Sequence, residues 1–415
     1  MAFYTNSVVT EIYNSVFDQS KYRSEFRLDS DKLYLSNMRI LNLGLTSVET
    51  GEKRYNLVNG IGAVVKSFTL YSGSTVLDKI VNFADFSAFQ AYNHTNQYNS
   101  DLAKVLARNG LGFVYEKEPN EANGVSKPIT IKETFPNCPH TPRLEQDISA
   151  LGFINLREVF PLLKGTGGMQ FLHTGLFKNL RVVIEYNVAG SVVGDGLGEV
   201  IGTTLPILVA DCVEDPMVAE KWLSSFKQQS WVSSEVETVV VPAELTGETQ
   251  HLKFRLTGAL GKTVNYMLIQ KKGSSEVSAL YGNHGSETCI DEAYQVYCNG
   301  SAVLPEDGVI ASNQRLALLN DVFGVMNTHH CANELPMYKS SNYIDDSANR
   351  VGRLDYFGCL INKKVSSLDL AFSRLTSTSA GVPARYSQGL TLQIFYGVLK
   401  AIVKDGKGGF QVVYL

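Results

Sequence analysis

Short runs in which apolar and polar residues alternate constrain this chain more than any other feature. The clearest run is residues 180–186, where every second side chain is large and apolar: Leu180, Val182, Ile184 and Tyr186. Because successive side chains of a strand point to opposite faces, this period of two predicts a strand with one buried face. Similar runs, separated by Gly, Asn, Asp and Ser, follow one another from Phe26 onward. The last of these runs, residues 401–415, predicts a hairpin with Asp405-Gly406 as its turn.

Helical patterns are fewer and short. They cover the first 20 residues and residues 100–110, 215–229 and 312–327. In the first segment Val9, Ile12 and Val16 are spaced as on one face of a helix, and in the third Asp215-Pro216 is typical of a helix start. Strands that do not alternate with full-length helices exclude a doubly wound α/β fold. A sandwich, a jelly roll or a barrel remains.

The chain contains a faint internal repeat. Phe26-Arg27-Leu28 recurs as Phe254-Arg255-Leu256, each half has one capped helix in its middle, and long alternating strands begin near Leu180 and Leu392. A length of 415 residues also favours two domains. We therefore predict an all-β chain of two tandem eight-stranded antiparallel jelly rolls. The predicted divisions are an N-terminal arm at 1–21, a first roll at 22–212, a linker helix and strand at 213–245, and a second roll at 246–415.

No motif predicts catalysis or a cofactor. The glycine groups Gly165 to Gly168 and Gly194 to Gly202 lack the G-x-G-x-x-G spacing, and a strand rather than a helix is predicted after the first. Residues 258–263 resemble a P-loop, but two residues separate the glycines where four are needed. We predict a hairpin turn there, with Lys262 at its tip.

No metal site is predicted either. His329, His330 and Cys331 are adjacent, whereas zinc ligands are usually spaced pairs. His251, the one histidine in a clear strand pattern, has no companion. The cysteines form no C-x-x-C pair and are expected to be reduced and mostly buried: Cys138, Cys212, Cys289, Cys298, Cys331 and Cys359. We expect no catalytic, cofactor-binding or metal-binding residue, although a site assembled from distant strands stays open on one sequence.

Charge and hydropathy limit the binding partners and the cellular compartment that we expect for this chain. With 37 basic and 41 acidic residues, no direct nucleic-acid partner is expected. The N-terminus lacks a signal-peptide pattern, and no apolar run reaches the ~20 residues of a membrane span. We therefore expect a soluble chain made in a reducing intracellular compartment, with Asn93 and Asn299 unglycosylated. The N-terminal segment is expected to dock on protein rather than on a membrane.

Five stretches resemble one viral family. They are RLDSDKLYLSNMRILNLGL (27–45), YNLVNGIGAVVKSFTLYSGSTVLDKIVNFADF (55–86), FINLREVFPLL (153–163), GLFKNLRVVIEYN (175–187) and TTLPILVADCVEDP (203–216). They resemble strands of the first roll in double jelly-roll major capsid proteins, similar to those of Polinton-like viruses and virophages. The likeness is strongest over residues 20–215, and the second half fits mainly by the order of its elements.

This resemblance implies a structural protein of the virion and not an enzyme. Three chains would form a homotrimeric, pseudo-hexagonal capsomer that tiles an icosahedral shell, with neighbouring capsomers, minor capsid proteins and penton proteins as partners. The arm would link capsomers on the inner side, so that removing residues 1–20 spares soluble trimers and impairs assembly. Asn155 and Asn179 would start strands, with Arg157 and Arg181 pointing away from the core. The alternative is a jelly-roll carbohydrate-binding or adhesin module.

Overall fold

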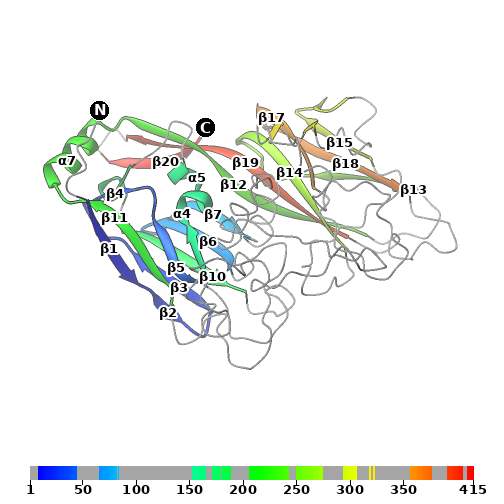
Figure 1. Cartoon of the computed structure of the whole chain (residues 1–415). Helices are drawn as coiled ribbons and strands as arrows, with labels where there is room; N and C mark the ends of the chain where they lie inside the picture. Colours follow the sequence, from blue (N-terminus) through cyan, green and yellow to red (C-terminus); the bar gives the residue numbers. More distant parts are fainter. Residues whose placement is uncertain are drawn as a thin grey trace, which may run out of the picture.

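The computed structural model describes most predicted strands of both halves (Figure 1). The described residues are 8–43, 65–81, 83, 152–164, 171–177, 179–187, 205–242, 249–273, 293–305, 317–318, 321–322, 356–375, 390–404 and 409–415. The strands within them form four sheets, and every described strand pair is antiparallel.

The first half contains two sheets. One has the order β8-β5-β11-β4-β9, with β1 added to β11, and is made of β1 (Val8–Asn14), β4 (Leu33–Leu35), β5 (Arg39–Leu43), β8 (Gly152–Asn155), β9 (Phe171–His173) and β11 (Ile207–Val213). The other has the order β2-β3-β10-β6-β7 and is made of β2 (Val16–Asp18), β3 (Arg23–Arg27), β6 (Val65–Ser72), β7 (Thr75–Val81) and β10 (Leu180–Tyr186).

The second half also contains two sheets. One has the order β12-β19-β14-β17, with β20 added to β19, and is made of β12 (Gln228–Val241), β14 (Thr263–Gly273), β17 (Tyr356–Lys364), β19 (Leu390–Lys404) and β20 (Phe410–Tyr414). The other has the order β13-β18-β15-β16 and is made of β13 (Thr249–Arg255), β15 (Ala293–Cys298), β16 (Ser301–Ala302) and β18 (Leu368–Leu375).

The two halves repeat one topology. The order β1-β11-β5-β8 corresponds to β12-β19-β14-β17, and β3-β10-β6-β7 corresponds to β13-β18-β15-β16. In each half the chain visits these strands in the same sequence, which is the jelly-roll arrangement. The fold-class prediction is therefore confirmed. The repeat at Phe26 and Phe254 is also confirmed, since β3 and β13 are equivalent. The repeat at Leu180 and Leu392 is wrong, because the counterpart of β10 is β18 and not β19.

The described helices are short. They are α4 (Leu156–Val159), α5 (Pro161–Lys164), the 3₁₀ turn η2 (Thr174–Leu176) and α7 (Pro216–Ser225). The predicted start of α7 is confirmed, because the Asp215 side chain accepts a hydrogen bond from the Met217 N–H at 2.9 Å. The predicted helix at 100–110 lies outside the described residues. So does the one at 312–327, except for residues 317–318 and 321–322, which are helical.

The helix predicted for the first 20 residues is wrong. Residues 8–14 pair with β11 along their whole length, from Val8 opposite Val213 to Asn14 opposite Ile207. The apolar residues whose spacing indicated a helix lie outside the core, with exposed fractions of 45% for Val9, 63% for Ile12 and 66% for Val16. The segment is thus the first strand of the first roll.

The strand pairing bears on the predicted domain divisions. It places residues 8–18 in the sheets of the first half and β12 in those of the second. The divisions at residues 22, 213 and 246 stay a prediction. We propose instead that the first roll begins at β1 and the second at β12, because these strands occupy equivalent positions.

Strand β19 is buried on both faces. All seven residues from Leu392 to Val398 are buried, and Gly397 lies so close to Tyr266 that an added Cβ would be 2.2 Å from the ring atom Cε1. Only glycine fits at this position. A strand buried on both faces loses the alternation of a half-buried one, and its position places β19 between two apolar clusters.

Candidate functional site: the junction between the two halves

The junction between the two halves is part of a continuous core. Trp231 of β12, Leu268 of β14, and Phe395 and Ile402 of β19 belong to the apolar cluster that fills the first roll. Figure 1 shows β12 and β19 extending from the second half across to the first, where β12 packs against β7 and α5. Burial of this kind fixes the two rolls to each other.

A chain of polar contacts crosses the same junction. Ser233 Oγ donates a hydrogen bond to Asp78 Oδ1 at 2.5 Å and accepts one from Lys400 Nζ at 3.2 Å. Glu235 lies 3.5 Å from Lys400 Nζ and 2.5 Å from Lys262 Nζ. We call these residues the junction cluster: Asp78, Ser233, Glu235, Lys262 and Lys400. Asp78 is its sole member from the first half.

The two carboxyl groups of the junction cluster differ in pKa because burial dominates at Asp78 and the neighbouring lysines dominate at Glu235. Asp78 is 0% exposed, and this burial raises its pKa to about 6, against the opposing effects of Ser233 and Lys400. Its Oδ2 has no hydrogen-bond partner in the part of the chain that the structure describes. Burial would also raise the pKa of Glu235, but Lys262 and Lys400 outweigh it and hold that pKa below its usual range. The junction therefore contains one well-paired carboxylate and one poorly paired carboxyl group.

We predict that Asp78 makes the stability of the junction depend on pH. Its folded pKa of about 6 exceeds its usual 3.8, so stability is lost as pH rises from about 4 to about 6. Full ionisation costs about 3 kcal/mol. Relative to wild type, Asp78→Asn should gain stability by up to that amount between pH 4 and pH 7, as measured by denaturant unfolding. Ser233→Ala should move the window to higher pH, and parallel stability curves for wild type and Asp78→Asn would contradict the assignment.

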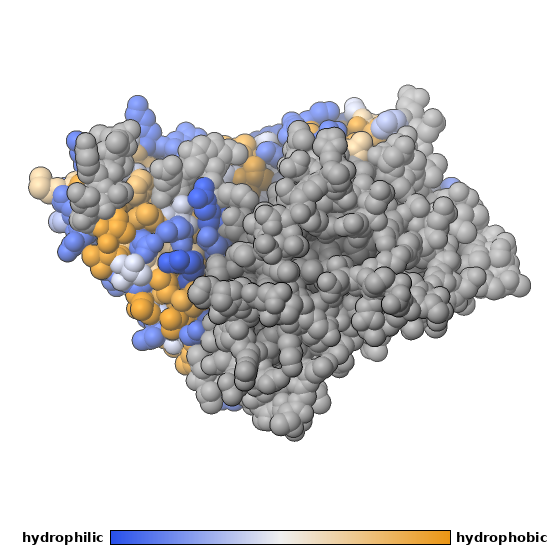
Figure 2. Space-filling view, in the orientation of Figure 1, coloured by the Kyte–Doolittle hydropathy of each residue, from blue (hydrophilic) through white to orange (hydrophobic). Residues whose placement is uncertain are grey.

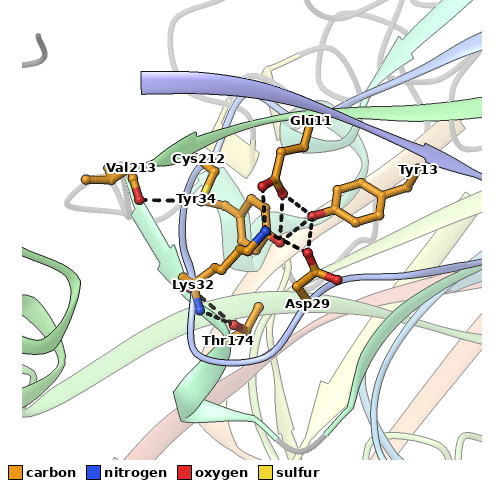
Figure 3. Close-up of polar contacts among 8 residues, drawn as sticks. All are labelled: Glu11, Tyr13, Asp29, Lys32, Tyr34, Thr174, Cys212 and Val213. Atoms are coloured by element: carbon orange, nitrogen blue, oxygen red, sulfur yellow. Dashed lines mark hydrogen bonds and ion pairs between the residues drawn. The ribbon is translucent and has the colours of Figure 1, made fainter. Parts of the chain in front are cut away.

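A second polar cluster fixes β1 to the first roll (Figure 3). Lys32 Nζ lies 2.5 Å from Glu11 Oε1 and 2.6 Å from Asp29 Oδ2, and the hydroxyl groups of Tyr13 and Tyr34 are 2.6 Å apart. Hydrogen bonds to Asp29 and Glu11 raise the pKa of the Lys32 ammonium. Because Glu11 and Tyr13 belong to β1, this N-terminal cluster joins the first strand to the turn after β3.

Helix α7 connects the halves at one side of the junction. The His173 ring stacks on Trp222 at a centroid distance of 6.2 Å, and its Nδ1 accepts a hydrogen bond from the Gly175 N–H at 2.9 Å. On the same helix, Phe226 contacts Phe410 of β20 edge to face, with centroids 5.6 Å apart. The pKa of His173 is lowered by burial, which keeps its ring neutral and able to accept that bond.

The two Asn-Leu-Arg tripeptides differ in structure. Asn179, with φ of 49°, directly precedes β10 as predicted. Asn155 instead ends β8 and caps α4, since its side chain accepts a hydrogen bond from the Arg157 N–H at 3.0 Å. The strand-start prediction for Asn155 is therefore wrong. The guanidinium of Arg181 lies 3.2 Å from Glu25 and 4.6 Å from the centre of the Tyr71 ring.

The predicted turn at residues 258–263 is present, but it is not a hairpin. It joins β13 to β14, which belong to different sheets. Lys262 does not extend from a tip into solvent, because its Nζ binds Glu235 and the carbonyl oxygen of Gly258, the latter at 2.8 Å. The lysine thus belongs to the junction cluster and is no phosphate ligand of a P-loop.

The other residues considered for chemistry are only partly described. Gly165 to Gly168, Gly194 to Gly202 and His329 to Cys331 lie outside the described residues. Cys212, Cys298 and Cys359 are buried and unpaired, and burial raises the pKa of the Cys359 thiol to about 12. Across the described strands and helices, no three His, Cys, Asp or Glu side chains are grouped as metal ligands would be. None of the described helices is long and apolar enough to span a membrane.

Known proteins match this chain by structure and not by sequence. Neither a family model nor a curated protein matches the sequence. The structure of VP54 of PBCV-1, fitted into a reconstruction of the virophage Sputnik, is similar with a TM-score of 0.57 and 12% identity over 100% of this chain and 98% of that one. The Sputnik virophage structure gives 0.56 and 11% over 100% and 89%. The chain has the double jelly-roll fold.

A third structure supports the same conclusion. The major capsid protein of mavirus is similar with a TM-score of 0.50 and 9% identity, over 100% of this chain and 91% of that one. At such low identity the likeness concerns the fold. The resemblance to double jelly-roll major capsid proteins is thereby confirmed at the level of architecture, for both rolls and over the full length of the chain.

Proposed function

We propose that this double jelly-roll chain is a major capsid protein whose homotrimers form pseudo-hexagonal capsomers of an icosahedral shell. The observation that carries the proposal is the match of both rolls over 100% of this chain and 98% of a chain fitted into a virophage shell. Single-roll matches would leave a binding module equally well supported, whereas two fused rolls provide six similar units in a trimer.

The junction supports this role. A capsomer needs its two rolls in one fixed relative position, since otherwise the six units would not form a regular outline. Trp231, Phe395 and Ile402 supply that rigidity by extending the first core into the second half. The junction cluster adds a polar link through Asp78 and Ser233.

Exposed apolar side chains support self-association. Ile12 and Val16 are 63% and 66% exposed, and Figure 2 shows hydrophobic side chains gathered on the left, where β1 and β2 run. Apolar residues gathered on a surface are typical of contacts with another protein. This surface is suited to a second copy of the chain, to a neighbouring capsomer, or to a minor capsid or penton protein of the virion.

The proposal is for a structural protein without catalysis, made in a reducing compartment and assembled into the virion. The free thiols of Cys212, Cys298 and Cys359 are compatible with that compartment. A carbohydrate-binding or adhesin module is not favoured, because the similar full-length structures are capsid proteins.

Light scattering of the purified chain tests the oligomer. We predict a stable species with a mass of three times 45.6 kDa, unchanged by dilution through the micromolar range, because obligate interfaces bury large areas. A monodisperse species of 45.6 kDa would contradict the capsomer.

A further inference from the structure

One end of the second roll is built from four segments that hydrogen bonds hold together. They are the turn at residues 257–263, the turn at 299–301, the loop at 363–367 and the C-terminal residues 414–415. The Gly261 N–H donates to the Val365 carbonyl at 2.8 Å, the Thr263 N–H to the Leu415 carbonyl at 3.0 Å, and Asn299 Nδ2 to the Lys364 carbonyl at 2.9 Å. We call this surface, together with the adjoining end of β13, the basic end.

The basic end carries an excess of positive charge, and two of its lysines are unpaired among the described residues. Lys363 and Lys364 are both exposed, and Lys253 and Arg255 on β13 have side chains 63% and 59% exposed. The carboxylate of Asp369 lies 3.5 Å from the Lys253 ammonium and 3.4 Å from the Arg255 guanidinium. Two further cations at this end, Lys262 and Lys400, belong to the junction cluster, and both are paired with Glu235. Asp369 is therefore paired with the two cations of β13, and Glu237 accepts hydrogen bonds from the Thr257 and Gly258 N–H groups, whereas Lys363 and Lys364 have no anionic partner among the described residues.

Exposed apolar side chains lie at the same end. Leu260 is 38% exposed at the tip of its turn, Tyr414 is 51% exposed and Leu415 is 38% exposed. The Tyr414 ring centre lies 5.1 Å from Lys262 Nζ, and the Leu415 carbonyl accepts a hydrogen bond from the N–H of Thr263, the first residue of β14. Aliphatic and aromatic side chains beside Lys and Arg are the composition of surfaces that bind at a lipid interface.

We propose that the basic end is a binding surface for a bilayer that carries anionic headgroups. Each unpaired cation near such a surface strengthens binding about fivefold at low salt, so that Lys363 and Lys364 together give on the order of thirtyfold. Leu260 would enter the headgroup region, a contact that a nucleic acid does not offer. A single-stranded nucleic acid would instead need a row of exposed aromatic rings for stacking, whereas Tyr414 is the one exposed ring at this end among the described residues.

This inference goes beyond the capsomer and does not depend on it. It also differs from membrane contact through an N-terminal arm, since the described residues of that segment form strands of the first roll. The two pairs of exposed cations, Lys253 with Arg255 and Lys363 with Lys364, lie more than a hundred residues apart in sequence, which is why no larger basic cluster is visible along the chain.

Vesicle flotation with the whole purified chain tests the proposal. We expect the protein to float with phosphatidylcholine vesicles containing about 30% phosphatidylserine, to stay unbound with pure phosphatidylcholine, and to be released by about 0.5 M salt. Lys363→Glu/Lys364→Glu should weaken binding at least tenfold, because two attractions become repulsions, and Leu260→Ser should weaken it severalfold. Lys66→Glu/Arg157→Glu changes the same charge at exposed positions of the first roll and should bind as wild type.

Three results would overturn the proposal. They are equal binding of the wild type to both kinds of vesicle, equal loss in the control variant, and a wild type that ignores vesicles while binding labelled DNA in a manner that Lys363→Glu/Lys364→Glu abolishes. The last would make the basic end a nucleic-acid surface. Light scattering of the same samples reports the oligomer separately, so that failure of the capsomer and failure of lipid binding are distinguishable.

Discussion

A variant that lacks residues 1–15 is expected to lose most of its soluble, folded protein. Strand β1 forms seven residue pairs with β11, and each ladder hydrogen bond lost costs about 1 kcal/mol. The truncation also removes Glu11 and Tyr13 from the N-terminal cluster and leaves Lys32 with Asp29 alone as its described anionic partner. We predict a loss of several kcal/mol, measured as soluble yield and as the midpoint of denaturant unfolding.

A matched control removes only residues 1–7. It keeps β1 and should retain the wild-type unfolding midpoint, since all seven pairs with β11 remain. If the chain without residues 1–15 were as soluble and as stable as wild type, residues 8–14 would not be a structural strand. That result would instead support the sequence-based interpretation of this segment as an N-terminal arm.

Replacement of Trp231 by alanine is expected to destabilise the junction by about 3–5 kcal/mol. This side chain is 1% exposed and extends from β12 of the second half into the core of the first. Its loss leaves a cavity where the halves meet, so that the halves should also unfold in separate steps. Denaturant unfolding followed by circular dichroism and by the fluorescence of the remaining Trp222 measures both effects.

The control for Trp231 lies on the same strand. Val240 of β12 is 69% exposed, and Val240→Ala should change the free energy of unfolding by less than about 0.5 kcal/mol. A Trp231→Ala variant that unfolded in one step within about 1 kcal/mol of wild type would show that the junction does not couple the two rolls.

Local patterns predicted the elements whose signals are local. The alternation of residues 180–186 gave β10, and the Asp215-Pro216 pair gave the start of α7. The strands of the final hairpin are confirmed by the pairing of β19 with β20, while the predicted turn at Asp405-Gly406 lies outside the described residues. In each case the pattern depends on backbone direction or on a cap within a few residues. Such signals do not require knowledge of the partner strand.

The N-terminal strand was mispredicted for a physical reason. Val9 and Ile12 are exposed, whereas Glu11 and Tyr13 are half-buried and make the contacts of the N-terminal cluster. Helical spacing of Val9, Ile12 and Val16 therefore suggested a buried face that does not exist. The strand forms because β11 lies beside it, about two hundred residues later in the chain.

The sequence contains a signal for the apolar part of the junction but none for its polar contacts. Residues 392–398 form a nearly continuous apolar run, and such a run indicates a strand buried on both faces. The polar contacts are different, because Asp78 lies 155 residues from Ser233 in the chain. No spacing rule connects them, so the junction cluster became visible only when the strands were placed in space.

Averaged electron micrographs of the purified protein, viewed end-on, test whether this chain is a capsomer subunit. We predict a hexagonal outline with six lobes from three chains, in which each chain contributes two adjoining lobes held together at Trp231 and Asp78. Particles with two lobes, or with a symmetry that places the rolls in no six-part ring, would contradict the assignment of this chain as a capsomer subunit.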